Sequence, residues 1–178
     1  DEASRLEAFC ILDAAGLASE DRPIPHAPPF RAPHHSASAA GLLGGGNPIR
    51  AGEVSLAHHG VLFLDELPEF DRRCLESLRE ILEQGVVRIA RAQTRCELPA
   101  RFQLIAAANP CPCGWYQSGV RDCRCDDATI PRYQRRVSGP LLDRIDLHVA
   151  VPAQAWRELE GPSSGPTSAV LRERVIRA

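Results

Sequence analysis

The chain has 178 residues, of which 44% are hydrophobic and 25% charged, and its formal net charge at pH 7 is −2. This composition is typical of a globular domain and argues against a fibre or a disordered chain. All 21 basic residues are arginines, which excludes both a phosphate-binding loop of the GxxxxGK[ST] type and a Schiff-base lysine.

The predicted elements of the first half alternate between helices and strands. A helix is predicted over residues 2–17, because the following residues form a stripe with helical spacing: Leu6, Phe9, Cys10 and Leu12 or Asp13. Prolines make 21–33 an extended connector, and the glycines of 41–52 indicate a loop. We expect a buried strand over 60–66 and a helix over 71–84 that ends at Gly85, with one apolar face made by Leu75, Leu78, Ile81 and Leu82.

In the second half, strands come first and helices follow. We expect a β-hairpin over 86–98, with its tip near Ala92–Thr94, and a strand over 102–108. After them come a cysteine-rich loop over 111–131, a helix over 131–144 that Gly139-Pro140 interrupts, a strand over 146–151, a linker over 160–168 and a helix over 169–178. Strands that alternate with helices predict an α/β domain with a largely parallel sheet, whose functional sites gather at the carboxyl ends of strands.

Charge is unevenly distributed along the chain. Residues 1–89 carry 8 arginines and 14 acidic residues, a net charge of −6, whereas residues 90–178 carry 13 arginines and 9 acidic residues, a net charge of +4. The second half is therefore the candidate for contact with a polyanion. Charge alone supports ordinary surface variation equally well.

Two adjacent carboxylates end the apolar run LFLDE, residues 62–66. Neighbouring residues at a strand end point to different sides. Asp65 could therefore bind a Mg²⁺ ion, while Glu66 could polarise an attacking water. Phosphoryl transfer needs both of these roles. The alternative, with equal weight on this motif alone, is that both acids merely end a strand or cap the next helix.

Two further positions suit nucleotide chemistry. Asn109 follows the strand over 102–108, where a neutral amide can donate to a phosphate or hold a water, although Asn-Pro is also a common turn start. Arg144 lies in the segment SGPLLDRIDLHV, and it could contact a phosphate that is bound by a neighbouring subunit. The alternative pairs Arg144 with Asp143 or Asp146.

Four of the seven cysteines are clustered. Two CxC pairs suit a tetrahedral structural Zn²⁺ site, and their members are Cys111, Cys113, Cys123 and Cys125. The alternatives are four reduced thiols in a mobile loop or two disulfides. The isolated cysteines, Cys10, Cys74 and Cys96, are expected to be small buried apolar residues.

Two histidine pairs, His34-His35 and His58-His59, invite a metal-site interpretation. Adjacent histidines in a strand would point to opposite faces, so each pair would chelate a metal poorly. We therefore expect structural or interfacial roles for both pairs.

The longer motifs resemble a known family. GEVSLAHHGVLFLDELPEF, ESLREILEQGVVRIARA, LIAAANPCPCG and SGPLLDRIDLHV are similar to the AAA+ ATPase module of magnesium-chelatase-like proteins of the ComM/YifB type, over about Phe30 to Val151. The resemblance implies a P-loop-type three-layer α/β core, with Asp65 and Glu66 as the Walker B pair and Asn109 as sensor 1. It also implies that Arg144 is an arginine finger acting in trans in a hexameric ring.

The resemblance identifies the hairpin over 86–98 as an insertion that projects toward the pore of the ring. Arg88, Arg91 and Arg95 are then candidate contacts to DNA phosphates. Arginines on a hairpin are equally often solvated edge charges that discourage strand pairing.

The resemblance also implies parts that this sequence does not contain. The resemblance implies that the first strand and the Walker A loop lie upstream of Asp1 and most of the helical lid beyond Ala178. The absence of lysine shows that the Walker A loop does not lie within the chain. We expect a partial AAA+ core over 1–159, then a linker and the start of the lid over 160–178. This chain alone is expected to bind ATP weakly and not to hydrolyse it measurably.

The expected function is that of a cytoplasmic, ATP- and Mg²⁺-dependent ring motor that remodels or translocates DNA. No secretory leader opens the chain, and no apolar run is long enough for a membrane span. One competing hypothesis is a motor subunit that drives Mg²⁺ insertion into a porphyrin, against which the cysteine loop argues. Another is a zinc-stabilised binding or assembly module without ATPase activity.

Overall fold

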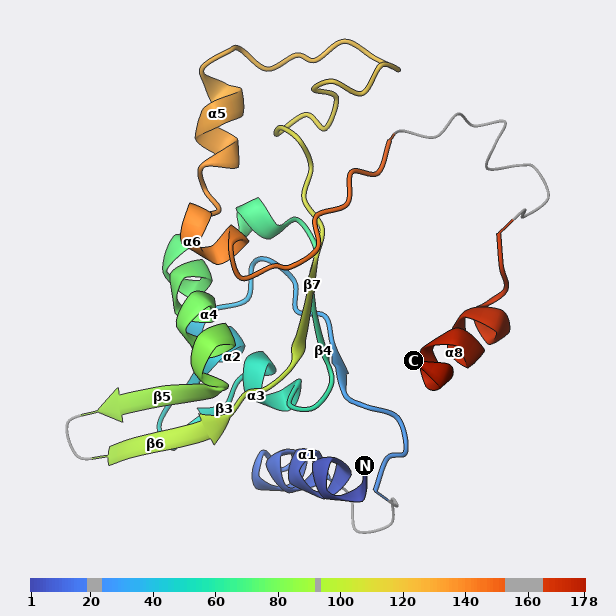
Figure 1. Cartoon of the computed structure of the whole chain (residues 1–178). Coiled ribbons are helices and arrows are strands. Elements are labelled where there is room, and N and C mark those ends of the chain that lie inside the picture. The colour runs from blue at the N-terminus through green and yellow to red at the C-terminus, as the bar shows by residue number, and fades with distance from the viewer. Residues whose placement is uncertain (19–23, 92–93, 153–164) are drawn as a thin grey trace.

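A three-stranded parallel sheet forms the centre of the molecule (Figure 1). The computed structural model describes residues 1–18, 24–91, 94–152 and 165–178. The sheet has the order β1-β4-β7, with β1 at Phe30–Arg31, β4 at Val61–Leu64 and β7 at Gln103–Ala106. Both strand pairs are parallel, which confirms the predicted α/β architecture.

The middle strand, β4, has the alternating burial of a strand packed on one face. Leu62 and Leu64 are fully buried, because successive side chains of a strand point to opposite faces. In the register with β7, Leu64 lies opposite Ala106. The ladder continues one step beyond the strands, where the backbone N–H of Ala107 donates to the carbonyl of Leu64 (2.9 Å). The carboxyl ends of β4 and β7 therefore lie at the same edge of the sheet.

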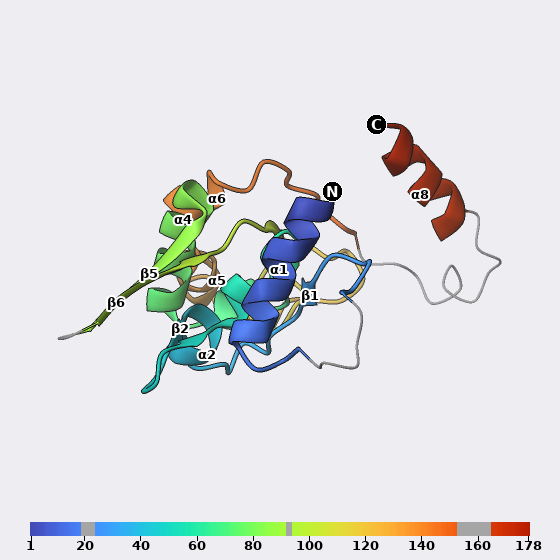
Figure 2. The same ribbon diagram turned by 90° about the horizontal axis from the view of Figure 1, so that it is seen from below.

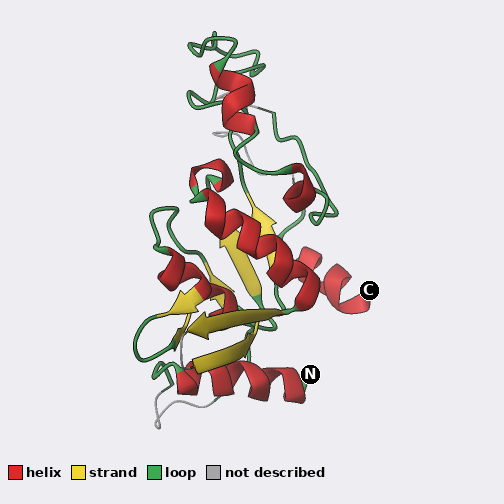
Figure 3. Cartoon of the chain, turned by 90° about the vertical axis from the view of Figure 1, so that its left-hand side faces the viewer, coloured by secondary structure: helices red, strands yellow, loops and turns green. Residues whose placement is uncertain are grey.

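Helix α4 lies over one face of the sheet (Figure 3), and its buried residues belong to the same apolar core as Leu62 and Leu64 of β4. It runs over Arg72–Gln84 and begins at Asp71, whose carboxylate accepts hydrogen bonds from the first backbone N–H groups. It ends at Gly85, which has φ 69° in the left-handed region that favours glycine. The predicted helix over 71–84 is confirmed, and its buried face is made by Cys74, Leu75, Leu78 and Ile81.

The N-terminal helix, α1, is shorter than predicted and buries a different face. It runs over Glu2–Ala14 and buries Ala8 and Ile11. The expected apolar stripe was wrong, since Leu6 is 52% exposed and Cys10 is also exposed. The reason is the direction from which α1 docks: Figure 2 shows α1 lying across one end of the body, and its contacts run mainly to α3 (Glu53–Leu56).

The glycine-rich segment is not the simple loop that the sequence predicted. It contains α2 (Ala39–Leu43) and a short antiparallel hairpin of β2 (Gly44–Gly45) and β3 (Arg50–Ala51). Gly44 has φ 99°, and a Cβ at Gly52 would overlap the backbone nitrogen of Gly44. Glycine is needed there because the two backbones approach closely.

A second, longer hairpin projects beside the sheet (Figure 1). It is made of β5 (Val86–Arg91) and β6 (Thr94–Pro99), which confirms the predicted hairpin. Two residues of the predicted tip, 92–93, lie outside the described residues, and Thr94 pairs with Arg91.

The helical region after the cysteine loop consists of two short helices. They are α5 (Thr129–Gln134) and α6 (Gly139–Leu142). The predicted interruption of the helix over 131–144 is present, but it lies before Gly139-Pro140, and these two residues begin the second helix, as proline suits a first helical turn. A single turn of 3-10 helix, η1 (Leu67–Glu69), follows β4.

The predicted strand over 146–151 is absent from the described residues. Leu147, Val149 and Val151 are 82%, 80% and 82% exposed. A strand needs a neighbouring backbone for its hydrogen bonds, and no described strand lies alongside this segment. Apolar and polar residues do alternate in this segment, but among the described residues no strand pairs with it.

The C-terminal helix, α8, runs over Ser168–Arg177 and confirms the predicted helix, while most of the predicted linker lies outside the described residues. Thr167 caps α8 by accepting a hydrogen bond from the backbone N–H of Val170. Among the residues that the structure describes, no helix combines the length and the apolar character needed to cross a bilayer.

Candidate functional site

The carboxyl edge of the sheet gathers three of the four predicted catalytic residues. Asp65 and Glu66 follow β4 directly, and Asn109 follows β7. Because β4 and β7 are parallel and in register, these side chains start from the same edge. Asp65 and Asn109 are exposed and Glu66 is half-buried, so all three are accessible to a ligand.

The backbone at Glu66 turns sharply away from the strand. Glu66 has φ 53° and ψ 45°, in the left-handed region that a non-glycine residue rarely adopts. Its backbone N–H donates to Oδ1 of Asp65 at 2.8 Å. This turn points the two carboxylates in different directions, as a metal ligand and a water-polarising group would require.

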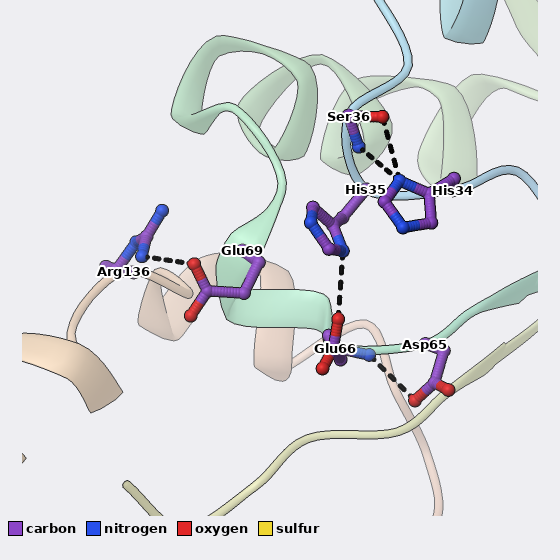
Figure 4. Close-up of polar contacts among 7 residues, drawn as sticks. All are labelled: His34, His35, Ser36, Asp65, Glu66, Glu69 and Arg136. Atoms are coloured by element: carbon purple, nitrogen blue, oxygen red, sulfur yellow. Dashed lines mark hydrogen bonds and ion pairs between the residues drawn. The ribbon is translucent and has the colours of Figure 1, made fainter. Parts of the chain in front are cut away.

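Glu66 has a partner that the sequence did not suggest. Nδ1 of His35 lies 2.9 Å from Oε2 of Glu66 (Figure 4). The ring of His35 also stands edge-on to Phe70, with centroids 6.4 Å apart, and lies 4.1 Å from the ring of His34. His35 reaches Glu66 because β1 neighbours β4, so the chain after β1 emerges at the edge where Glu66 lies.

His34 is fixed separately from His35. Nδ1 of His34 lies 2.8 Å from the hydroxyl of Ser36 and accepts from its backbone N–H at 3.2 Å (Figure 4). The expected structural role thus suits His34, whereas His35 belongs to the site. The sequence offered no signal for His35, because 21–33 was expected to be an extended connector, whereas the structure forms β1 at its end and places it beside β4.

Arg144 is held some way from this edge. Its Nη2 lies 2.6 Å from Oε1 of Glu83, and its Nε donates to the same oxygen at 2.9 Å. Glu83 lies in the last turn of α4, whereas the first turn of α4 is the one that follows the Asp65–Glu66 edge. The structure therefore pairs Arg144 with Glu83, and neither with Asp143 nor with Asp146 as the simpler alternative supposed.

The four clustered cysteines come together as a potential metal site. Their sulfur atoms all lie within 4.8 Å of one another, and all four are free thiols: Cys111, Cys113, Cys123 and Cys125. Three of the sulfur–sulfur distances are 3.4, 3.7 and 3.6 Å. Tetrahedral Zn²⁺ with Zn–S bonds of about 2.3 Å sets its sulfurs about 3.8 Å apart. The donor set and its spacing therefore fit such an ion.

The backbone N–H groups around Cys113 favour its thiolate form. The backbone N–H of Arg124, followed by that of Trp115, lowers the pKa of Cys113 to about 6. Gly114 has φ 80°, and its N–H closes a turn onto the carbonyl of Cys111 at 3.0 Å. This turn lets two residues only two positions apart direct their sulfurs to one point.

Of the isolated cysteines, only Cys74 is buried as predicted, while Cys96 is half-buried and Cys10 exposed.

The structure describes the side chains of two of the three candidate DNA contacts on the hairpin, Arg88 and Arg95. Arg88 Nε donates to Oε1 of Glu97 at 2.7 Å across the two strands, and Arg88 also contacts Gln84. Arg95 is exposed, opposite Ala90. The side chain of Arg91 lies outside the described residues. Arg88 is thus partly neutralised within the hairpin, and Arg95 is the more available charge.

The pair His58-His59 forms a second group with Glu7 of α1. Nε2 of His59 and Nε2 of His58 lie 2.7 and 3.3 Å from the same Glu7 oxygen. The expectation that adjacent rings point apart was wrong, because the pair lies in a turn, with His59 at φ 57°, and the rings are 3.9 Å apart.

The tautomer of His58 argues against a metal at this second group. Nδ1 of His58 accepts the backbone N–H of Arg101 at 3.0 Å, which leaves the proton of the neutral ring on Nε2. A protonated Nε2 donates to Glu7 and is not a metal ligand. The group therefore ties α1 to the body, which is the structural role that the sequence predicted.

Comparison with known proteins is consistent with this geometry. The family described as magnesium chelatase, subunit ChlI, matches residues 1–159. Competence protein ComM of Haemophilus influenzae is 51% identical over 150 residues, which are 84% of this chain and 29% of that protein. The uncharacterized protein Rv2897c of Mycobacterium tuberculosis is 49% identical over 177 residues, 97% of this chain and 34% of that protein.

A more distant match extends the comparison. DNA replication licensing factor Mcm6 of Drosophila melanogaster is 33% identical over 99 residues, 56% of this chain and 11% of that protein. The chain thus spans about a third of the length of its more similar relatives, and its α/β core is a partial AAA+ fold of the P-loop type. The chain belongs to the magnesium-chelatase family, with relatives of the ComM/YifB type.

Proposed function

We propose that this chain is the part of an ATP-hydrolysing AAA+ ring motor that supplies the Walker B, sensor 1 and arginine-finger residues. The observation that carries the proposal is the convergence of Asp65, Glu66 and Asn109 at one edge of a parallel sheet. In open α/β sheets, ligands bind beyond the carboxyl ends of the strands. Residues 1–159 are then a partial core, and 160–178 a linker and the start of the lid.

Each residue of the site has a distinct role in this proposal. Asp65 holds the Mg²⁺ of a bound ATP, and the metal neutralises phosphate charge. Glu66 accepts a proton from the attacking water, and Asn109 orients that water or donates to the γ-phosphate. Arg144 leaves Glu83 and reaches the nucleotide of a neighbouring subunit, which requires an oligomeric ring, a hexamer in this proposal.

DNA is the proposed client of the motor, in the cytoplasm. The hairpin presents Arg88, Arg91 and Arg95, and the second half of the chain has a net charge of +4 from 13 arginines and 9 acidic residues. Backbone phosphates are the main source of sequence-independent nucleic-acid affinity. The relatives named competence protein and DNA replication licensing factor agree with a DNA-related role.

The cysteine cluster is proposed to hold a structural Zn²⁺. Four thiolate ligands close a tetrahedral site and leave no position for catalysis. Zinc would order the loop between β7 and α5, which otherwise contains no helix or strand over 107–128.

A chelatase motor is the second candidate, favoured by the name of the matching family. Such a motor would share Asp65, Glu66, Asn109 and Arg144 and differ only in its client. A zinc-stabilised binding module without ATPase activity would instead need none of these four residues. Two observations distinguish the DNA motor from these alternatives: whether ATP is hydrolysed and whether DNA stimulates the hydrolysis.

The deciding experiment measures ATP hydrolysis by the protein in its full natural length, with and without single-stranded and branched DNA at fixed salt. We expect stimulation by DNA, a loss of about 10²–10⁴-fold in Glu66→Gln and of about 10³-fold or more in Arg144→Ala. Glu80→Gln, an exposed position on α4, is the matched control. Hydrolysis that ignores DNA would favour the chelatase motor, and no hydrolysis at all would favour the binding module.

A further inference from the structure

A cleft of about 530 Å³ lies between the start of α4 and helix α5, apart from the residues assigned above. Four arginines line it: Arg72, Arg132, Arg135 and Arg136. Its volume is within the range of small-molecule sites, about 300–1,000 Å³. Spacing along the sequence does not indicate that these four arginines share one cleft, because Arg72 lies about 60 residues before the others.

The arrangement of the four arginines follows from the fold. Arg132, Arg135 and Arg136 are spaced by three and four positions on α5 and the turn after it, so they share one side of the helix. Arg72 comes from the first turn of α4, on the other wall. The cleft therefore combines charges from two elements that are far apart in the sequence.

The acidic neighbours do not cancel this charge. Glu69 pairs with Arg136 at 2.9 Å (Figure 4), and the carboxylate of Asp71 is engaged as the cap of α4. Arg132 donates to the hydroxyl of Thr129 at 3.2 Å. Within the described part of the chain, Arg72 and Arg135 form no ion pair. Asp126 also interacts electrostatically with Arg132, and counting it with Glu69 and Asp71 against the four arginines leaves an excess of one positive charge.

The remaining wall of the cleft is apolar. The exposed Ala128 and Pro131 contribute to the lining together with the buried Phe70, and the two exposed residues offer an apolar surface to a sugar next to the charged groups. Guanidinium groups match phosphate oxygens in geometry and in charge. We propose that this cleft binds a phosphate group of a nucleotide unit. The bound phosphate could come from the backbone of the DNA client or from a free nucleotide, and for both sources this proposal rests on the proposed function.

The test uses the protein in its full natural length and the double variant Arg132→Gln/Arg135→Gln, both of whose positions are exposed. Binding of fluorescein-labelled oligo-dT is followed by anisotropy over a series of salt concentrations. The loss of two phosphate contacts should weaken binding about 10- to 30-fold at 0.1 M salt and reduce the slope of log K against log salt by about 1.4. Arg132→Lys/Arg135→Lys should keep the slope.

The matched control is Arg172→Gln/Arg174→Gln on α8, which removes the same charge outside the cleft and should leave the slope within 0.5 of the wild-type value, about a third of the expected change. A second arm measures binding of ATP and of inorganic pyrophosphate in a Glu66→Gln background. Loss of oligo-dT binding alone identifies DNA as the source, and loss of ATP and pyrophosphate binding alone identifies the free nucleotide.

The proposal is overturned if the cleft variant and the α8 control behave alike toward oligo-dT, ATP and pyrophosphate. It is also overturned if the wild-type protein binds none of the three. Failure of the proposed function looks different: the wild type would not hydrolyse ATP, while the cleft variant would still lose phosphate binding relative to its control.

Discussion

His35 and Glu66 meet at 2.9 Å across the gap between two neighbouring strands. The contact joins the segment after β1 to the turn after β4, and it holds the carboxylate that we propose to activate water. His35 does not touch the reacting atoms in this proposal and acts through Glu66, so it is a positioning residue.

Replacement of His35 should therefore slow hydrolysis without weakening nucleotide binding. For His35→Ala we expect kcat for ATP to fall between about 10- and 100-fold with KM unchanged, because a misplaced catalytic group costs rate rather than affinity. His35→Gln should restore part of the rate, since its amide can donate to the same oxygen. His34→Gln is the control, and equal losses at both positions would show that His35 has no special part in placing Glu66.

Removal of one cysteine of the cluster should release the metal and loosen its loop. We expect the wild-type protein to contain one Zn²⁺ per chain by metal analysis, and Cys113→Ser to contain much less than one. The thermal midpoint of Cys113→Ser should fall, and chelator should lower the wild-type midpoint to a similar value. Cys96→Ser, a half-buried cysteine outside the cluster, should keep its zinc. A wild-type protein without bound metal would refute the structural zinc site.

The burial of α4 in the apolar core should contribute strongly to stability. Leu78 is fully buried in the core cluster, so Leu78→Ala should lower the free energy of unfolding by about 2–5 kcal/mol. Leu6→Ala is the matched control, because Leu6 is 52% exposed and should cost less than about 1 kcal/mol. Denaturant unfolding of both variants measures the difference, and equal losses would contradict the packing described for α1 and α4.

Acidification should weaken the folded state through His58. Burial lowers the pKa of His58 from its ordinary value of 6.5, against an opposing hydrogen bond with Glu7, while the charges of His59 and Arg101 lower it further. The unfolded chain therefore takes up the proton first as the pH falls below 6.5, and stability decreases by at most about 1.4 kcal/mol per pH unit.

Glu7 acts in a different range of pH. Hydrogen bonds from His59 and His58 lower the pKa of Glu7 from 4.5, so its contribution is present above 4.5 and is lost only in stronger acid. Denaturant midpoints between pH 7.5 and 5.5 thus report on His58. The curve of His58→Gln should be flatter than that of the wild type, with His26→Gln, an exposed position, as the control. Parallel curves for wild type and His58→Gln would rule out this linkage.

Much of the core could be predicted from local signals. The four-residue strand β4 and the 13-residue helix α4 were both visible in their apolar spacing, and Asp71 and Gly85 mark the ends of α4. These signals act within one turn or one strand, so they do not depend on distant parts of the chain. The strand over 146–151 failed for the opposite reason, because an alternating pattern needs a paired backbone before it becomes a strand.

By itself, the sequence determined the types of residue that carry the chemistry: two carboxylates at a strand end, an asparagine at the next, and four cysteines with close spacing. Only the tertiary structure decided their partners. The parallel order β1-β4-β7 brings His35 to Glu66, the turn of α4 places Glu83 beside Arg144, and the approach of α5 to α4 assembles four arginines in one cleft. Such pairs depend on which elements become neighbours, and that choice is made by packing of the whole core rather than by spacing along the chain.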